Sequence, residues 1–96
     1  MITSKQRRHL KKLVHSMEPT VYIGKGGLTK NTVKEMDNYL KAHELVKVKL
    51  QDGCDDEPKA LANEAAAELG AEFVQAIGRK FSLYRKSDEK LIDLPK

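Results

Sequence analysis

Three glycines within four positions, Gly24, Gly26 and Gly27, set the main constraint on how this chain can fold. They follow the β-branched and aromatic residues of a strand predicted over 20–23, and Thr29 just beyond them can cap a helix. The segment is therefore predicted to run from a strand through a glycine loop to a helix N-terminus. Glycine allows another chain to approach the backbone closely, and a first helical turn offers unpaired N–H groups with partial positive charge. A phosphate group is a natural ligand for such a loop.

Positive charge is concentrated around this loop. The formal net charge is +4 over 96 residues, but residues 1–34 contain eight basic residues against Glu18 alone, a net charge of +7. The remaining residues carry a net charge of −3. Concentrated positive charge favours polyanions through counterion release, with an affinity that falls steeply with salt. A solvated basic helix face is the alternative interpretation of this pattern.

Hydrophobic spacing and capping residues predict seven secondary-structure elements. The first is a helix over 4–17, which begins with the capping-box pair Thr3 and Gln6 and cannot continue through Pro19. The others are a strand over 20–23, a helix from 30 to about 42 or 43, a strand over 45–50, a helix from 58 to about 69, and strands over 72–77 and 80–85 joined in a hairpin at residues 78 and 79.

This order of elements predicts a small α/β or α+β domain. Helices that alternate with strands imply a sheet with parallel or mixed pairing and helices packed on it. The length indicates a single domain over 1–96, with an ordered core over about 2–86. We expect residues 87–96 to form a loosely ordered polar tail, in which Leu91 and Ile92 are candidates to dock on the core.

Composition excludes several classes of protein. The content of apolar residues, 40%, and of charged residues, 33%, is typical of a folded globular domain. The single Cys54 can form no internal disulfide, and there is neither a long apolar run nor a leader at Met1, so we expect a cytoplasmic protein without a membrane anchor. His9, His15 and His43 lack the spacing of metal ligands, and no catalytic arrangement is evident. We therefore expect no enzyme activity, no metal and no cofactor.

The glycine loop fits neither of two common nucleotide-binding patterns. A P-loop requires Lys-Ser or Lys-Thr after a longer glycine loop, but Leu28 and Thr29 follow Gly27, and a dinucleotide fingerprint requires a glycine at position 29. The G-x-x-G spacing of Gly24 and Gly27 before a helix fits the way in which KH-type modules hold a nucleic-acid backbone. An ordinary turn is the alternative, but the basic surroundings favour RNA.

Basic side chains near the loop are the candidate contacts. Lys25 lies inside the loop, and Lys30 and Lys34 share one helix face that begins there, so a continuous basic surface is expected. The chain has only five aromatic residues, all Tyr or Phe, and several are predicted to be buried. We therefore expect recognition of RNA backbone or shape rather than recognition dominated by base stacking.

Taken together, these features resemble the bacterial YhbY-type proteins, which consist of a single CRM domain (chloroplast RNA splicing and ribosome maturation). The resemblance covers about residues 2–86, and its motifs occur in the same order and spacing. The matching residues are Arg7-Arg8 with Leu10 and His15, Pro19, the run from Ile23 to Thr29, Val46-Lys47-Val48, Ile77-Gly78-Arg79 and Leu83-Tyr84-Arg85.

The resemblance implies a four-stranded sheet with helices, similar to the C-terminal domain of translation initiation factor three, and a loop related to that of KH domains. It implies association with precursors of the large ribosomal subunit and a role in ribosome assembly. The RNA-binding residues that it implies are Gly24, Lys25, Gly26, Gly27 and Lys30, with Arg7, Arg8, Lys11 and Lys12 of the first helix beside them, and Arg79, Lys80 and Arg85 as further candidates. Lys34 is added to this set because it shares a helix face with Lys30.

The expected partners follow from this interpretation. They are ribosomal RNA and, in addition, ribosomal proteins, and we expect the protein to be a monomer. The alternative function is a protein-interaction module that docks through the acidic segment 52–57 without contacting RNA. The two functions can coexist on one assembling particle.

Overall fold

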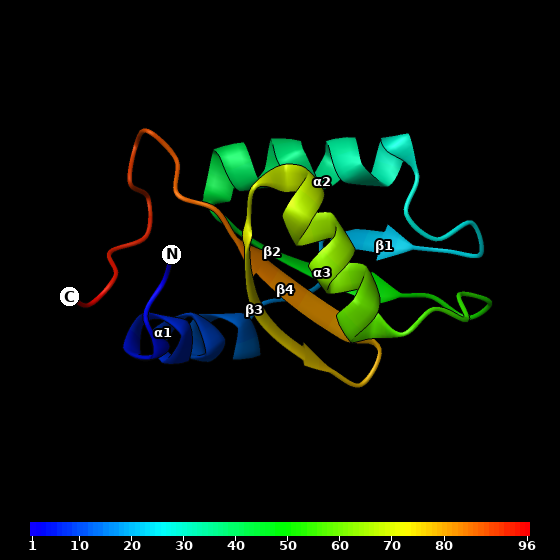
Figure 1. Ribbon diagram of the computed structural model, residues 1–96, viewed down its shortest axis with the longest axis horizontal. Helices are drawn as coiled ribbons and strands as arrows, with labels where there is room; N and C mark the ends of the chain where they lie inside the picture. Colours follow the sequence, from blue (N-terminus) through cyan, green and yellow to red (C-terminus); the bar gives the residue numbers. More distant parts are fainter.

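A computed structural model describes all residues 1–96 and contains three helices and four strands in the predicted order (Figure 1). The elements are α1 Ser4–His15, β1 Val21–Ile23, α2 Lys30–His43, β2 Leu45–Leu50, α3 Pro58–Leu69, β3 Glu72–Ile77 and β4 Lys80–Tyr84. The predicted ends are correct to within two residues. None of the three helices combines the length and the apolar composition that a membrane span requires.

The four strands form one mixed sheet in the order β1-β2-β4-β3. β1 is parallel to β2, whereas β4 is antiparallel to both β2 and β3. This confirms the prediction of a four-stranded mixed sheet. Since β1, β2 and β3 end where β4 begins, the glycine loop, the β2–α3 loop and the β3–β4 turn lie at the same end of the sheet (Figure 1).

The main core lies between one face of the sheet and the helices α2 and α3. Side chains alternate along β2, so that Val46, Val48 and Leu50 point into this core. α2 contributes Met36 and Leu40, both fully buried. The small side chains of α3 let this helix approach the sheet closely; they are Ala62, Ala65 and Ala66.

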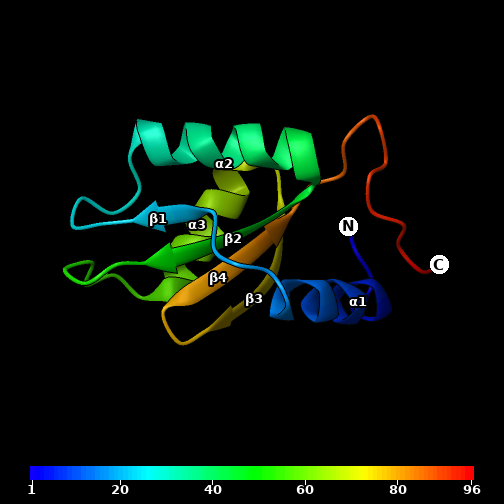
Figure 2. The same ribbon diagram turned by 180° about the vertical axis from the view of Figure 1, so that it is seen from behind.

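A second, smaller core lies on the opposite face of the sheet. Leu10 and Val14 of α1 pack there against Leu45, Val74 and Tyr84. α1 covers only the end of the sheet where β2 begins, and the other end of this face carries no helix (Figure 2).

Lys47 helps to hold α1 in this position. Its Nζ donates hydrogen bonds to the carbonyl oxygens of Val14, at 3.0 Å, and Met17, at 2.9 Å. A cation at the C-terminus of a helix satisfies its last carbonyl groups and interacts favourably with its dipole. The α1–sheet contact therefore combines apolar packing with two hydrogen bonds from a charged group.

The C-terminal segment differs from the expected loose tail, because a buried carboxylate binds it. Glu44 ends α2 in the left-handed conformation (φ 68°) and is fully buried. Its Oε2 accepts hydrogen bonds from the Ser87 N–H and hydroxyl at 2.6 and 2.7 Å, and its Oε1 accepts one from the Ile92 N–H at 2.7 Å. Ile92 and Leu94 pack on the second core, whereas Leu91 is 46% exposed. Local hydrophobic periodicity could not reveal this long-range contact.

The hydrogen bonds of Glu44 decide its ionisation. Burial alone would raise the pKa of this carboxyl, but the bonds from Ser87 and Ile92 outweigh burial, so its pKa lies below the ordinary value. Burial, and then the negative charge of Glu44, raise the pKa of Tyr84. Glu44 is therefore ionised near neutral pH and stabilises the docked C-terminal segment.

This arrangement predicts acid-sensitive stability. A carboxyl whose pKa is lower in the folded state contributes stability above its unfolded pKa, here 4.5, and loses it as the pH falls through the folded pKa. Melting temperature should therefore be nearly constant around neutral pH and decrease below about pH 4.5. Glu44→Gln should cost about 1.5–3 kcal/mol at neutral pH and weaken the acid dependence. Identical melting profiles for the native chain and Glu44→Gln would contradict the role of this carboxylate.

Candidate nucleic-acid interface

The glycine loop forms a tight turn whose tip is exposed. The Gly27 N–H donates a hydrogen bond to the Gly24 carbonyl at 3.0 Å, which places Lys25 and Gly26 at the tip. Both tip residues are exposed, and Gly27 is buried. Backbone and a lysine side chain are thus presented together at the end of β1.

The N-terminus of α2 follows directly and is capped as predicted. Thr29 Oγ1 accepts a hydrogen bond from the Thr32 N–H at 3.2 Å, and the Thr29 N–H donates to Thr32 Oγ1 at 2.9 Å. The N–H groups of Lys30 and Asn31 make no hydrogen bond within the protein. Two donors therefore remain available at the positive end of the helix dipole.

Three lysines surround these donors. Lys25 at the tip, and Lys30 and Lys34 on the first turns of α2, are all exposed. None of them forms an ion pair with a carboxylate of the protein. The loop, the helix N-terminus and these lysines form what we call the loop surface, and they can bind an anion through both backbone and side chains.

The acidic β2–α3 loop lies directly beside the glycine loop, a contact that no local sequence pattern indicates. The Gln51 N–H donates to the Ile23 carbonyl at 2.8 Å and joins the two connections. A Cβ atom at Gly27 would lie only 2.9 Å from Asp56 Oδ2, and one at Gly53 would lie 4.0 Å from Lys25 Cβ. Exposed carboxylates thus border one side of the loop surface. They belong to Asp52, Asp55, Asp56 and Glu57.

The two candidate arginines outside α1 are hydrogen-bonded within the protein. Arg79 Nη2 donates to the Cys54 carbonyl and thereby connects the β3–β4 turn to the acidic loop. Arg85 donates to the carbonyl oxygens of Leu69 at 2.9 Å and Asp37 at 3.2 Å, and it forms an ion pair with Asp37 Oδ1 at 2.9 Å. Both guanidinium groups therefore have structural partners.

Asp37 is held ionised in this arrangement. Hydrogen bonds from Lys41 and then from Arg85 lower the pKa of its carboxyl below the ordinary value, against the opposing effect of burial. This pairing joins α2 to the end of β4.

The structure separates the basic residues of α1 from the loop surface. α1 lies at the end of the molecule that also holds both chain termini, whereas the glycine loop lies at the opposite end (Figures 1 and 2). Arg8, Lys11 and Lys12 are exposed, and Arg7 Nε donates to the Phe73 carbonyl at 3.1 Å. The resemblance implied that these residues stand beside the loop, and this is wrong because β1 carries the chain away from α1.

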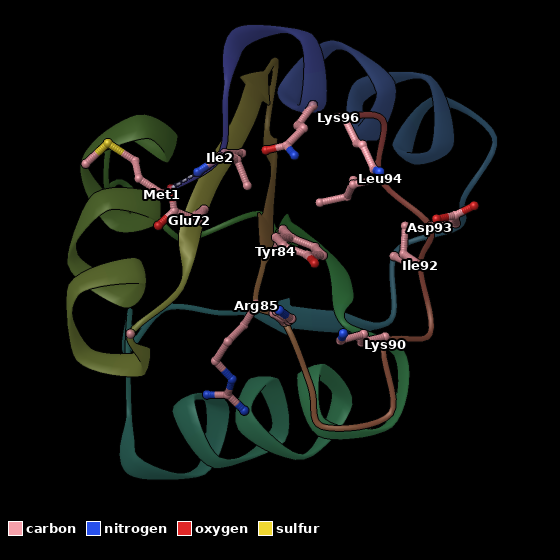
Figure 3. Close-up of a pocket in the computed structure, with 13 residues that line it drawn as sticks. Met1, Ile2, Glu72, Tyr84, Arg85, Lys90, Ile92, Asp93, Leu94 and Lys96 are labelled. Atoms are coloured by element: carbon pink, nitrogen blue, oxygen red, sulfur yellow. Dashed lines mark hydrogen bonds between the residues drawn. The ribbon is translucent and has the colours of Figure 1, made fainter.

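A cleft of about 770 Å³ lies at the same end as the termini (Figure 3). The cleft lies between the docked C-terminal segment on one side and the start of the chain and the end of β4 on the other. At the border of the cleft, the Ile2 N–H donates a hydrogen bond to Glu72 Oε1 at 3.2 Å. Figure 3 shows the Arg85 side chain directed away from the cleft. The cleft contains charges of both signs and shares no residue with the loop surface.

Comparison with known proteins identifies the family. Residues 2–85 match the CRS1/YhbY (CRM) domain, and the chain belongs to this family. This confirms the resemblance inferred from the sequence, over almost the same range.

Two relatives and one solved structure are similar to this chain over almost their whole lengths. A Haemophilus influenzae protein named RNA-binding protein is 43% identical over 96 residues, which cover 99% of this chain and 96% of that protein. YqeI of Bacillus subtilis, named a probable RNA-binding protein, is 35% identical over 96 residues, which cover 99% of this chain and 100% of that protein. The solution structure of a Staphylococcus aureus protein described as a candidate RNA-binding protein is 40% identical, with a TM-score of 0.84 over 99% of this chain and 100% of that one.

The two neighbouring glycines of the loop should respond differently to substitution. Gly27 has a φ of +67° and its missing Cβ faces Asp56, whereas a Cβ at Gly26 would make an ordinary contact with Thr29 Cγ2 at 3.6 Å. Gly27→Ala should therefore lower the free energy of unfolding by about 1–2 kcal/mol. Gly26→Ala should change it by less than about 0.5 kcal/mol. Denaturant unfolding checks this, and equal losses for the two variants would contradict the geometry of the turn.

Proposed function

We propose that this protein binds RNA and that the loop surface holds the RNA backbone. The observation that carries the proposal is the exposed turn over Gly24–Gly27, which leads into a helix N-terminus with two unbonded N–H groups. Three exposed lysines without ion-pair partners surround it. Membership of the CRM family and the names of the relatives support RNA as the ligand.

The chemistry of the loop surface suits a phosphate diester. Gly26 adds no side chain at the tip, so a phosphate can approach the backbone, while the exposed Lys25 and Lys30 supply positive charge. The carboxylates that border the surface at Asp52 and Asp56 repel phosphate from their side. Together these charges direct RNA phosphates towards the lysines and away from the carboxylates of the acidic loop.

The exposed basic residues of α1 provide a second, separate positive surface. Because Arg8, Lys11 and Lys12 lie at the other end of the molecule, they cannot grip the same phosphates as Lys25. In this proposal they contact a distant part of a large folded RNA or attract it at long range. Arg7, Arg79 and Arg85 support the RNA-binding surfaces through their hydrogen bonds within the protein, and Lys80 is exposed in part to solvent.

We propose ribosomal RNA of the large-subunit precursor as the target and ribosome assembly in the cytoplasm as the role. This rests on the resemblance to the YhbY-type members of the family. A monomeric chain of this size with two basic ends suits a factor that bridges segments of a folded RNA. The proposed action is binding rather than catalysis.

Protein docking is a second candidate function, favoured by the exposed acidic loop. Its four carboxylates stand beside the loop surface and are free to meet a basic partner such as a ribosomal protein. Added salt would weaken that contact as well, so salt alone cannot separate it from RNA binding. Direct binding to protein-free RNA does separate the two.

Binding to purified large-subunit ribosomal RNA at two salt concentrations tests the proposal. The double variant Lys25→Asp, Gly26→Asp should bind at least about tenfold more weakly than the native chain, since two acids at the tip repel phosphate. The slope of log affinity against log salt should also fall by about one.

A charge-matched control isolates the site. Ala67→Asp with Lys96→Asp changes the net charge equally at exposed positions away from the loop, and it should reduce binding much less. Thermal melting establishes that each variant is folded. If the folded loop variant binds like the native chain, the loop is only a turn and the proposed site is wrong.

A further inference from the structure

One half of a sheet face remains uncovered next to the loop surface. Each strand contributes one residue to a single row across it: Tyr22 of β1 is paired with Lys49 of β2, Lys49 with Lys80 of β4, and Lys80 with Ile77 of β3. We call these four residues the open sheet face. α1 covers only the other end of this side of the sheet (Figure 2).

The alternation of the strands fixes the direction of these side chains. Val21 and Ile23 on either side of Tyr22 enter the main core, as do Val48 and Leu50 on either side of Lys49. Successive side chains of a strand point to opposite faces, so the open sheet face must point away from α2 and α3. No packing within the domain explains its composition.

Two large apolar side chains are exposed in this row. Tyr22 is 47% exposed and Ile77 is 67% exposed. Tyr22 is the one exposed aromatic residue. Phe81 and Tyr84 are buried, Phe73 packs on the main core, and Tyr39 lies against His43 with the two ring centroids 4.3 Å apart.

The two lysines between them are unpaired. Lys49 and Lys80 stand directly opposite each other on antiparallel strands, and neither forms an ion pair. Like charges directly opposite on adjacent strands are destabilising, and an anion placed between them would relieve that repulsion. The adjacent amines of Lys49 and Lys80 therefore favour the binding of an anionic ligand at this face.

We propose that the open sheet face binds an unpaired nucleotide of single-stranded RNA, with its base stacked on Tyr22 and its phosphates at Lys49 and Lys80. Tyr22 Oη donates a hydrogen bond to the Pro19 carbonyl at 3.4 Å, which restrains the ring. Tyr22 and Lys49 also border a shallow depression, together with Leu50, Gln51 and Asp52. A nucleotide offers an aromatic base to the ring and a phosphate to the amines, and single-stranded RNA repeats both along its chain.

The position of the row relative to the loop supports one continuous strand. Gly24 follows Tyr22 by two residues, and two residues of β-strand span only about 7 Å. A strand of RNA held at the glycine loop therefore passes within reach of the ring. The inference rests on the proposed function, since it extends the path of an RNA already held by the loop surface.

Binding of a short single-stranded oligoadenylate, compared with an RNA duplex of equal length, tests the inference. Tyr22→Ala should weaken oligoadenylate binding about tenfold and leave duplex binding nearly unchanged, because bases within a duplex cannot stack on the ring. Tyr22→Phe keeps the ring and should bind almost as well as the native chain. Equal affinity of Tyr22→Ala and the native chain for oligoadenylate would overturn the inference, as would an equal loss for both RNAs.

A tryptophan reporter gives a second readout that does not depend on affinity. The chain contains no tryptophan, so Tyr22→Trp places a single indole in the open sheet face. Stacking of adenine should quench its emission on addition of oligoadenylate. Leu91→Trp is the control, since Leu91 is 46% exposed in the C-terminal segment, and its emission should not change. If oligoadenylate binds and the emission of neither indole is quenched, the inference is wrong.

These outcomes separate the inference from the proposed function. If the loop variant loses RNA and Tyr22→Ala does not, RNA binding stands and the open sheet face has no part in it. If the native chain binds no RNA of either kind, the proposed function itself fails. A second copy of this chain is the other possible occupant of the open sheet face, and sedimentation of the native chain tests for it. If the native chain is a dimer and Ile77→Asp dissociates it, a second copy covers this face and the inference is wrong.

Discussion

The alternation of side chains along β2 is the constraint on which the rest of this structure depends. β2 is the strand that pairs parallel to β1 on one side and antiparallel to β4 on the other. Val46 and Val48 form the main core with α2 and α3, while Leu45 and Lys47 hold α1 on the opposite face. A shift of one residue in its register would exchange these two sets and leave both cores unfilled. Lys49 continues the second set beyond the reach of α1, and so the open sheet face is a direct consequence of the same alternation.

The site arises because mixed pairing gathers three connections at one end of the sheet. The glycine loop, the acidic loop and the β3–β4 turn come from distant parts of the sequence, yet Gln51 and Arg79 connect them by hydrogen bonds. Asp56 fills the place where a side chain at Gly27 would stand. The glycines of the loop therefore have two roles. Gly27 allows the left-handed backbone conformation and the close approach of Asp56, and Gly26 leaves the tip open to a ligand. Stability and binding can be changed separately at neighbouring positions.

The sequence predicted local features well and distant contacts poorly. Strand alternation over 45–50 and helix capping by Thr3 and Thr29 depend only on residues that are close together in the sequence. The ends of the elements could therefore be predicted closely from the sequence. The pairing of Arg85 with Asp37 and the burial of Glu44 depend on residues more than forty positions away along the chain. The resemblance also implied that the basic residues of α1 stand beside the loop, which is wrong because proximity in sequence says nothing about the direction in which β1 runs. A motif of this kind predicts the class of ligand, and only the fold shows which basic residues can reach it together.

The most direct test of RNA binding at the loop surface is a titration of the isotopically labelled chain with single-stranded RNA, followed by amide chemical shifts in NMR spectra. If RNA is held at the loop end of the sheet, the largest changes should fall on Gly24–Gly27 and the N–H groups of Lys30 and Asn31, and should continue to Tyr22 and Lys49. Changes at α1 should be smaller and should disappear first as salt is added. Changes confined to α1 and the C-terminal segment, with none at the glycine loop, would contradict RNA binding by the loop surface.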